Sequence, residues 1–400
     1  MAAKRTTGHR PDGKPAVGLD IGATSVRAAL VAPRKGENRP ATILRLAEQP
    51  LPDETFAAGK LVDSKALTSA VKALWRKGHL RPRTAWFNLP EDIVLTRRTS
   101  APWLVDEDFG KALRYQVADA LPIDVDTVEL DYYSLGDRDE TQSSGRTTRM
   151  KDILLVAAPT ADIDARARAL LAARVEPQGT DTSAFPLIRA ACVGLGQDDG
   201  QVHAIVDIGS AQLTAVVHRS GVPLFVRGIS NSAGHAAVLA VADALDLHDD
   251  LAEATRLAAT VGLTGAAPIV AGVAESSVFA HLPGALDSAN TSLDGDTADQ
   301  RARDTAARAL DPWANSLVRE IRQTLDYYSA SADQPITTVT LAGRTAAMPG
   351  LIERLATSIP YRVLRFDPLA GLAAHRRVRR NTPVDSRFAT AIGLALGTHA

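Results

Sequence analysis

Two short stretches of the sequence repeat an acidic residue followed by a glycine turn. The first is AVGLDIGATSVRAALVA, residues 16–32, and the second is HAIVDIGSAQLTAVV, residues 203–217. In each stretch an apolar run ends at an aspartate, Asp20 or Asp207, and a glycine with small neighbours leads into a second apolar run. The pattern predicts two strands joined by a tight turn, whose backbone amides can approach an anion closely.

Phosphate is the anion that such turns typically bind, and the aspartates predict a metal ion beside it. Asp20 and Asp207 would each hold a hydrated Mg²⁺ that bridges phosphate oxygens. The predicted phosphate-binding residues are Gly22, Ala23, Thr24, Ser25, Arg27, Gly209, Ser210 and Gln212. One such turn alone is more simply explained as an ordinary turn in a sheet. Two of them at corresponding positions favour a phosphate clamp made of two halves.

Other signatures for nucleotide or metal binding are missing from the sequence. It contains neither GxxxxGK[ST] nor a GxGxxG that opens a helix, and its nine histidines form no HExxH. The single cysteine, Cys192, excludes an internal disulfide and a multi-cysteine metal site. The sequence therefore predicts no metal other than Mg²⁺.

Composition indicates a soluble globular protein of more than one compact unit. The chain has 400 residues, of which 45% are hydrophobic and 23% charged, and its net charge of −1 predicts no bulk attraction to nucleic acid. The polar and basic residues 1–15 lack an apolar run and predict a disordered tail rather than a signal peptide. The longest uncharged run, 257–274, contains glycines and a proline, so we expect no direct membrane insertion.

The elements that would position the two turns recur in both halves of the chain. Strands are predicted over 17–20, 25–33 and 42–48, and again over 202–207, 213–218 and 223–229. Apolar residues at helical spacing predict helices over 64–78 and 307–330, the second preceded by an Asp-, Ser- and Thr-rich loop over 283–305. The repeat predicts one duplicated α/β unit, with a period of about 187 residues between the two aspartates.

Longer segments of the sequence resemble a known family in their order and spacing. VGLDIGATSVRAALV, VDIGSAQLTAVV and TLAGRTAAMPGLIERLATSI resemble the phosphate-1, phosphate-2 and adenosine elements of the actin-like ATPase superfamily. LRYQVADALPIDVDTVELDYYSL and ARVEPQGTDTSAFPLIRAA are similar to segments of the type IV pilus assembly protein PilM family, and so are GVPLFVRGIS, REIRQTLDYYSA and ATAIGLALG. The resemblance extends from about residue 17 to residue 397.

This resemblance implies an α/β, ribonuclease H-like duplicated, two-lobed fold with an inserted subdomain, 1C. The implied division is 16–85 for subdomain 1A, 86–183 for the partner-binding subdomain 1C, 184–230 for the return to 1A and the start of 2A, 231–334 for 2B, and 335–400 for the rest of 2A and a final helix returning to 1A. ATP with Mg²⁺ is implied between the lobes. The implied partners are the cytoplasmic N-terminal tail of a PilN-like membrane protein, bound by 1C, and other pilus assembly components. The protein would then be cytoplasmic, at the inner face of the membrane through its partner.

The resemblance also implies nucleoside-binding residues, and here the sequence departs from the family pattern. They are Ser232, Ala233, Glu253, Arg256, Gly343, Arg344 and Thr345. Arg344 replaces a glycine of the adenosine element, so its side chain would fill the pocket, stack on adenine or reach a phosphate. No residue is identified that orients water for hydrolysis, so we expect at most a weak ATPase.

Two other functions fit the same superfamily. An FtsA-like cell-division protein is expected to carry a C-terminal linker and an amphipathic membrane helix, whereas this sequence ends directly after its predicted last helix. A sugar or metabolite kinase needs a carboxylate as general base, for which Asp181 is the nearest candidate. The residues around Asp181 match the PilM segment instead.

Overall fold

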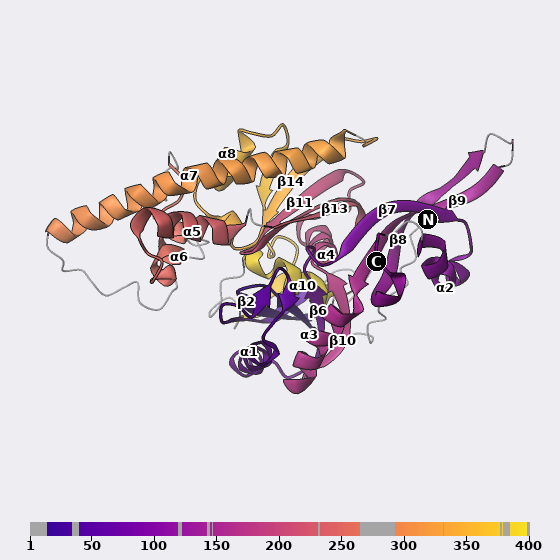
Figure 1. Ribbon diagram of the computed structural model, residues 1–400, viewed down its shortest axis with the longest axis horizontal. Helices are drawn as coiled ribbons and strands as arrows, with labels where there is room; N and C mark the ends of the chain where they lie inside the picture. The colour runs from indigo at the N-terminus through magenta and orange to yellow at the C-terminus, as the bar shows by residue number, and fades with distance from the viewer. Residues whose placement is uncertain are drawn as a thin grey trace.

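The structure is a computed structural model that describes most of the chain. The described residues are 14–33, 40–118, 122–141, 145, 147–230, 233–264, 293–330, 332–376, 378 and 385–397. Nearly all of the predicted tail, residues 1–15, lies outside them. Figure 1 shows the long helix α7 (Leu293–Ser329) along the upper side of the molecule. The hairpin of β8 (Val128–Thr141) and β9 (Thr147–Pro159) projects at the right-hand end.

The first sheet contains the first of the two turns. Its strand order is β10-β6-β1-β2-β3-β16. Its strands are β1 (Ala16–Ile21), β2 (Ser25–Ala32), β3 (Thr42–Pro50), β6 (Thr84–Leu89), β10 (Glu176–Thr182) and β16 (Ala373–Ala374). The strands β1, β2 and β3 pair antiparallel, and β6 joins β1 in parallel, so the predicted hairpin is confirmed. Residues Val17 and Leu19 face a core that includes α1 (Ser64–Lys77), while Gly18 between them faces α10 (Ala389–Leu396).

The second sheet repeats this topology and contains the second turn. Its strand order is β13-β12-β11-β14-β15. This order corresponds strand for strand to β3-β2-β1-β6-β10 of the first sheet. Its strands are β11 (Val202–Ile208), β12 (Gln212–Arg219), β13 (Val222–Ser230), β14 (Ile336–Ala342) and β15 (Arg362–Arg365). The helices α5 (Gly234–Leu245), α6 (Leu251–Thr260), α7 and α8 (Leu351–Ala356) pack on it. The predicted duplication of one α/β unit is therefore confirmed.

A third sheet is inserted into the first unit. It consists of β7 (Leu95–Pro102), β9 (Thr147–Pro159) and β8 (Val128–Thr141), in that order and antiparallel. Helix α2 (Asp106–Val117) covers one face, where the ring of Phe109 lies 4.8 Å from that of Tyr132. The implied segment 86–183 is thus divided, because β6 and β10 pair in the first sheet and α3 (Thr160–Ala172) packs on α1.

The remaining elements are short, apart from α4 (Ala184–Leu195), which packs against α10. They are β4 (Phe56–Ala57), β5 (Lys60–Leu61) and the 3-10 turns η2 (Val125–Thr127), η5 (Thr345–Ala347) and η6 (Ser386–Phe388). None of the described helices combines the length and the apolar character that crossing a bilayer requires.

Helix α7 corrects one prediction. It begins at Leu293, so the predicted loop over 283–305 is wrong from that residue onward, while residues 283–292 lie outside the described set. Where burial is described, the added turns are mostly exposed: Asp299, Gln300, Arg301, Arg303 and Asp304 are all exposed. They are stabilised by pairs such as Arg303 with Asp299, 3.0 Å apart and four residues apart in the chain. Hydrophobic periodicity does not detect a helix of this kind.

Candidate functional site

The two glycine turns have the same backbone geometry. The amide of Gly22 donates to the carbonyl of Ser25 at 3.1 Å, and the amide of Gly209 donates to the carbonyl of Gln212 at 3.0 Å. A Cβ atom added to Gly22 or Gly209 would lie 3.1 or 2.9 Å from the same carbonyl oxygen. The close backbone approach therefore favours glycine in each turn, more strongly at Gly209 than at Gly22.

The two turns meet directly. The hydroxyl of Thr24 donates to the hydroxyl of Ser210 at 3.1 Å. Within the described part of the chain, the backbone N–H groups of Ala23, Thr24, Ser210 and Ala211 have no hydrogen-bond acceptor. The structure thus brings the two predicted halves together, with unused amide donors on both sides.

The start of α5 is bonded to the second turn. The amides of Gly234 and His235 donate to the carbonyls of Gly209 and Ser210 at 2.9 and 2.7 Å. Thr345 approaches the same carbonyl of Gly209, with its hydroxyl at 3.5 Å. These hydrogen bonds hold the second turn against the start of α5. They also use two of the backbone N–H groups in the first turn of this helix. Ala233 caps α5 and is buried, and Ser232 lies outside the described residues.

Both oxygens of Asp20 are already bonded. Arg27 Nη1 lies 3.0 Å from Asp20 Oδ2, and the side-chain amide of Asn88 donates to Asp20 Oδ1 at 3.1 Å. Burial raises the pKa of Asp20 more than Arg27 and Asn88 lower it. Asp20 therefore does not fit the role of a direct metal ligand in this arrangement, because a guanidinium already neutralises its charge.

Asp207 differs from Asp20 in having no such partner. Its carboxylate forms no hydrogen bond or ion pair with the described residues, and burial, followed by the charge of Asp20, raises its pKa to about 7. Gly343, with φ at +89°, packs so closely that an added Cβ would lie 2.5 Å from Asp207 Oδ1. A cation beside Asp207 would stabilise the ionised form, so this position fits Mg²⁺.

A group of charged residues, the Glu48 cluster, lies beside the first turn and consists of Arg27, Glu48, Arg344, Asp385 and Arg387. Glu48 Oε1 accepts from Arg27 Nε at 3.0 Å and from the Arg344 guanidinium, and Oε2 accepts from Arg387 Nη1 at 3.0 Å. Burial opposes the ionisation of Glu48, but the three arginines outweigh it and hold its pKa at about 2. Since Glu48 is on β3 and Arg344 follows β14, the cluster ties the first sheet to the second.

The remaining predicted phosphate- and nucleoside-binding residues differ in their distance from the two turns. Gln212 accepts from the amide of Asp92 at 3.3 Å, next to the third sheet. Glu253 and Arg256 pair with each other at 2.5 Å on α6, and no contact among the described residues joins them to the turns. Arg344 points to Glu48, which gives its side chain an ion pair.

Three residues of the site carry too weak a sequence signal to be identified. Asn88 interrupts the apolar strand β6, where a polar residue indicates a buried hydrogen bond; it accepts from the amide of Ile21 at 2.7 Å. Glu48 and Arg387 show no such signal. They are 339 residues apart in the chain and meet only in the folded protein.

Comparison with known proteins agrees with this fold. The family model described as type IV pilus assembly protein PilM matches residues 18–269 and 295–399. A solved PilM–PilN type IV pilus biogenesis complex contains a chain 21% identical to this one, with a TM-score of 0.70, over 95% of this chain and 97% of that chain. Ethanolamine utilization protein EutJ from Carboxydothermus hydrogenoformans is 13% identical, with a TM-score of 0.52, over 98% of this chain and 91% of that chain. The chain belongs to the type IV pilus assembly protein PilM family and has the actin-like ATPase fold.

Proposed function

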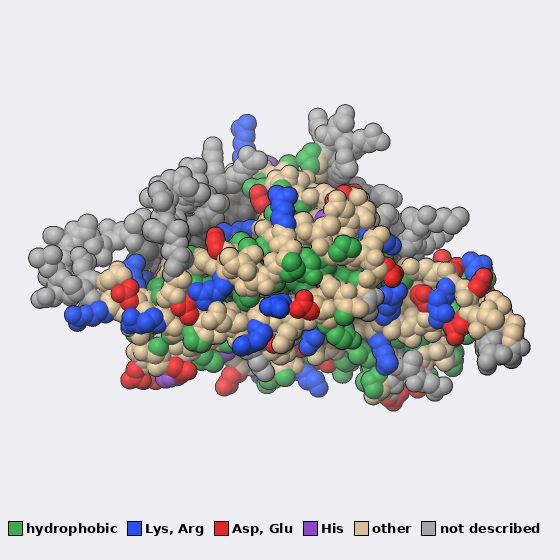
Figure 2. Space-filling view, turned by 90° about the horizontal axis from the view of Figure 1, so that it is seen from above, with side chains coloured by type: hydrophobic (Ala, Val, Ile, Leu, Met, Phe, Trp, Pro, Cys, Tyr) green, Lys and Arg blue, Asp and Glu red, His purple; other side chains and the backbone are tan. Residues whose placement is uncertain are grey.

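We propose that this protein acts in type IV pilus assembly by binding the cytoplasmic N-terminal tail of a PilN-like membrane protein through the third-sheet subdomain. Membership of the PilM family and similarity to a chain solved as part of a PilM–PilN complex support the proposal. The protein would work in the cytoplasm at the inner face of the membrane, held there by this partner and other pilus assembly components. No nucleic-acid partner is proposed, since basic and acidic side chains are interspersed on the face shown in Figure 2.

The exposed apolar residues around α2 carry this proposal. Tyr115 on α2 is 84% exposed, Val105 immediately before the helix is 52% exposed, and Ile123 beyond its end is 37% exposed. The opposite side of α2 is buried through Phe109 and Leu113. Exposed apolar side chains on and beside one helix favour a protein-binding surface.

Replacing Tyr115 by glutamate is expected to weaken binding of the tail at least about tenfold, because an exposed apolar anchor becomes charged. The measurement is calorimetric titration of the full-length protein with a synthetic peptide of the N-terminal tail of the PilN-like protein from the same organism. The matched control is Leu171→Glu on α3, where an apolar side chain is likewise exposed, at 55%. This variant should bind the peptide like the unmodified protein. Equal affinity of the Tyr115 variant and the control would exclude α2 as the docking surface.

We further propose that ATP binds between the two turns, with Mg²⁺ beside Asp207. The free amides of both turns and the Thr24 and Ser210 hydroxyls supply donors for phosphate oxygens. Bound Mg²⁺ would neutralise part of the phosphate charge, and Asp207 would hold it directly or through water. In this proposal the bound nucleotide stabilises the protein, and it is hydrolysed slowly at most.

A kinase is the weaker alternative. Asp181, the general base that a kinase would need, forms an ion pair of 2.6 Å with Arg189. This contact withdraws the carboxylate from a role in taking a proton from a substrate hydroxyl.

Removal of Mg²⁺ tests the nucleotide proposal. A fluorescent ATP analogue is expected to bind saturably with Mg²⁺ and about tenfold more weakly in EDTA, because Asp207 then faces the phosphates without a cation. Asp207→Asn should abolish most of this difference, whereas Asp164→Asn, at a 56% exposed side chain on α3, should leave it unchanged. Absence of saturable binding under either condition would refute the proposal.

A further inference from the structure

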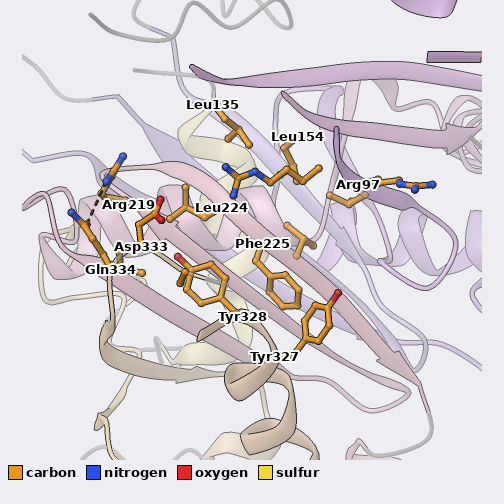
Figure 3. A pocket seen from close by; sticks show the side chains of 15 residues that line it. Arg97, Leu135, Leu154, Arg219, Leu224, Phe225, Tyr327, Tyr328, Asp333 and Gln334 are labelled. Atoms are coloured by element: carbon orange, nitrogen blue, oxygen red, sulfur yellow. Dashed lines mark hydrogen bonds between the residues drawn. The ribbon is translucent and has the colours of Figure 1, made fainter. Parts of the chain in front are cut away.

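A pocket of about 530 Å³ lies where the third sheet meets the second sheet (Figure 3). Its walls come from β7, β8 and β9 on one side and from β11, β12, β13, the end of α7 and residues 332–334 on the other. The proposed docking surface on α2 and the two glycine turns do not contribute to it. The pocket is therefore a separate feature of the molecule.

Two strand edges border this pocket. The strands β7 and β13 are the outermost strands of their sheets. Three successive residues of each line the pocket, 96–98 of β7 and 224–226 of β13. Val202 of β11 and Arg219 of β12 also line the pocket, so it lies at one end of the second sheet as well as along the edge of β13. Such an edge presents backbone N–H and C=O groups to an added strand.

Aromatic and aliphatic side chains cover the floor of the pocket. The ring of Phe225 lies 6.0 Å from those of Tyr327 and Tyr328, and Figure 3 shows Leu135 and Leu154 on the opposite wall. Tyr327 is 68% exposed. An apolar side chain inserted here would bury a surface that the described residues leave open to solvent.

The charges around the pocket are mainly positive. Arg97, Arg98 and Arg219 line it with a single acidic residue, Asp333. The basic N-terminal segment of this chain, 1–15, has the same sign of charge and does not suit the pocket. A segment rich in aspartate and glutamate complements it.

We propose that the pocket binds an extended, acidic segment of a partner protein, which adds a strand to β7 or β13 and places an aromatic or aliphatic side chain on the floor. Strand addition supplies backbone hydrogen bonds, and the arginines select for acidic neighbours. The segment would connect the inserted subdomain to the second sheet. This is a second partner surface, distinct in position and in ligand chemistry from the proposed tail-binding surface on α2.

Selection from a phage-displayed library of random peptides, with the full-length protein as bait, tests the proposal. Enriched peptides are expected to alternate acidic residues with aliphatic or aromatic ones. A synthetic copy of the most enriched peptide should bind the unmodified protein at least about tenfold more tightly than the double variant Arg98→Glu/Arg219→Glu. The same peptide carrying N-methyl groups at alternate backbone positions should lose binding, since it cannot pair with a strand edge.

Controls separate this surface from the rest of the molecule. Lys72→Glu/Arg76→Glu reverses two exposed charges on α1 and should leave binding unchanged, as should Tyr115→Glu. Tyr327→Glu provides a second variant of the pocket at an exposed residue and should weaken binding like the double variant. Enrichment of basic peptides, no enrichment at all, or equal binding to the pocket variants and the α1 control would overturn the proposal.

Discussion

Replacing Glu48 by alanine is expected to lower the free energy of unfolding by about 3 kcal/mol, the usual cost of removing one partner from a buried ion-pair group. Glu48 is 18% exposed and accepts from three arginines, of which Arg27 and Arg387 are each 15% exposed. Without Glu48 these guanidinium groups lose their shared counter-ion and repel one another. Denaturant unfolding followed by circular dichroism measures the difference.

The control for this prediction is a salt bridge on the surface. Glu107 is 83% exposed and lies 3.0 Å from Lys111, which is 70% exposed. Glu107→Ala should cost at most about 0.5 kcal/mol, because solvent screens the pair. If Glu48→Ala cost no more than Glu107→Ala, the Glu48 cluster would contribute nothing to the connection between the two sheets.

Replacing Gly393 by alanine is expected to destabilise the protein by about 3 kcal/mol or more, or to prevent folding. An added Cβ atom would lie 1.8 Å from the carbonyl oxygen of Pro186 and 2.4 Å from its carbon. These are backbone atoms of α4, so relief requires the two helices to move apart and to lose the contact of α10 with α4 and β1. The thermal midpoint and the yield of soluble protein measure the effect.

Gly194 on α4 provides the matched substitution. An added Cβ there has no neighbour nearer than 3.7 Å. Gly194→Ala should therefore stabilise the protein by up to about 1 kcal/mol through the higher helix propensity of alanine. Equal effects of the two substitutions would mean that the close contact at Gly393 relaxes at no cost.

The local elements could be predicted from the sequence because their signals are local. The two acidic glycine turns, the strands on either side of them and the first amphipathic helix each follow from fewer than about 20 consecutive residues. The same signals place Gly22 and Gly209 in equivalent turns. The meeting of Thr24 with Ser210 follows from the duplication only once a two-lobed fold is assumed.

Tertiary partners could not be predicted in the same way. Nothing near Glu48 in the sequence indicates that Arg344 and Arg387 converge on it. The sequence predicts hydrated Mg²⁺ beside Asp20 and gives no sign that Arg27, seven residues away, bonds to the same carboxylate. The choice between a metal and a guanidinium depends on the rotamer of one arginine, which a motif does not specify.

The contact of Gly18 with α10 has a consequence for biosynthesis. An added Cβ at Gly18 would lie 2.1 Å from the carbonyl of Ala391, so β1 is shaped for a helix encoded more than 370 residues later. During translation the second unit therefore emerges before the first is complete, and one face of the first sheet stays open to water until α10 arrives. Contacts of such high sequence separation slow folding, so we expect the nascent first unit to depend on chaperone protection.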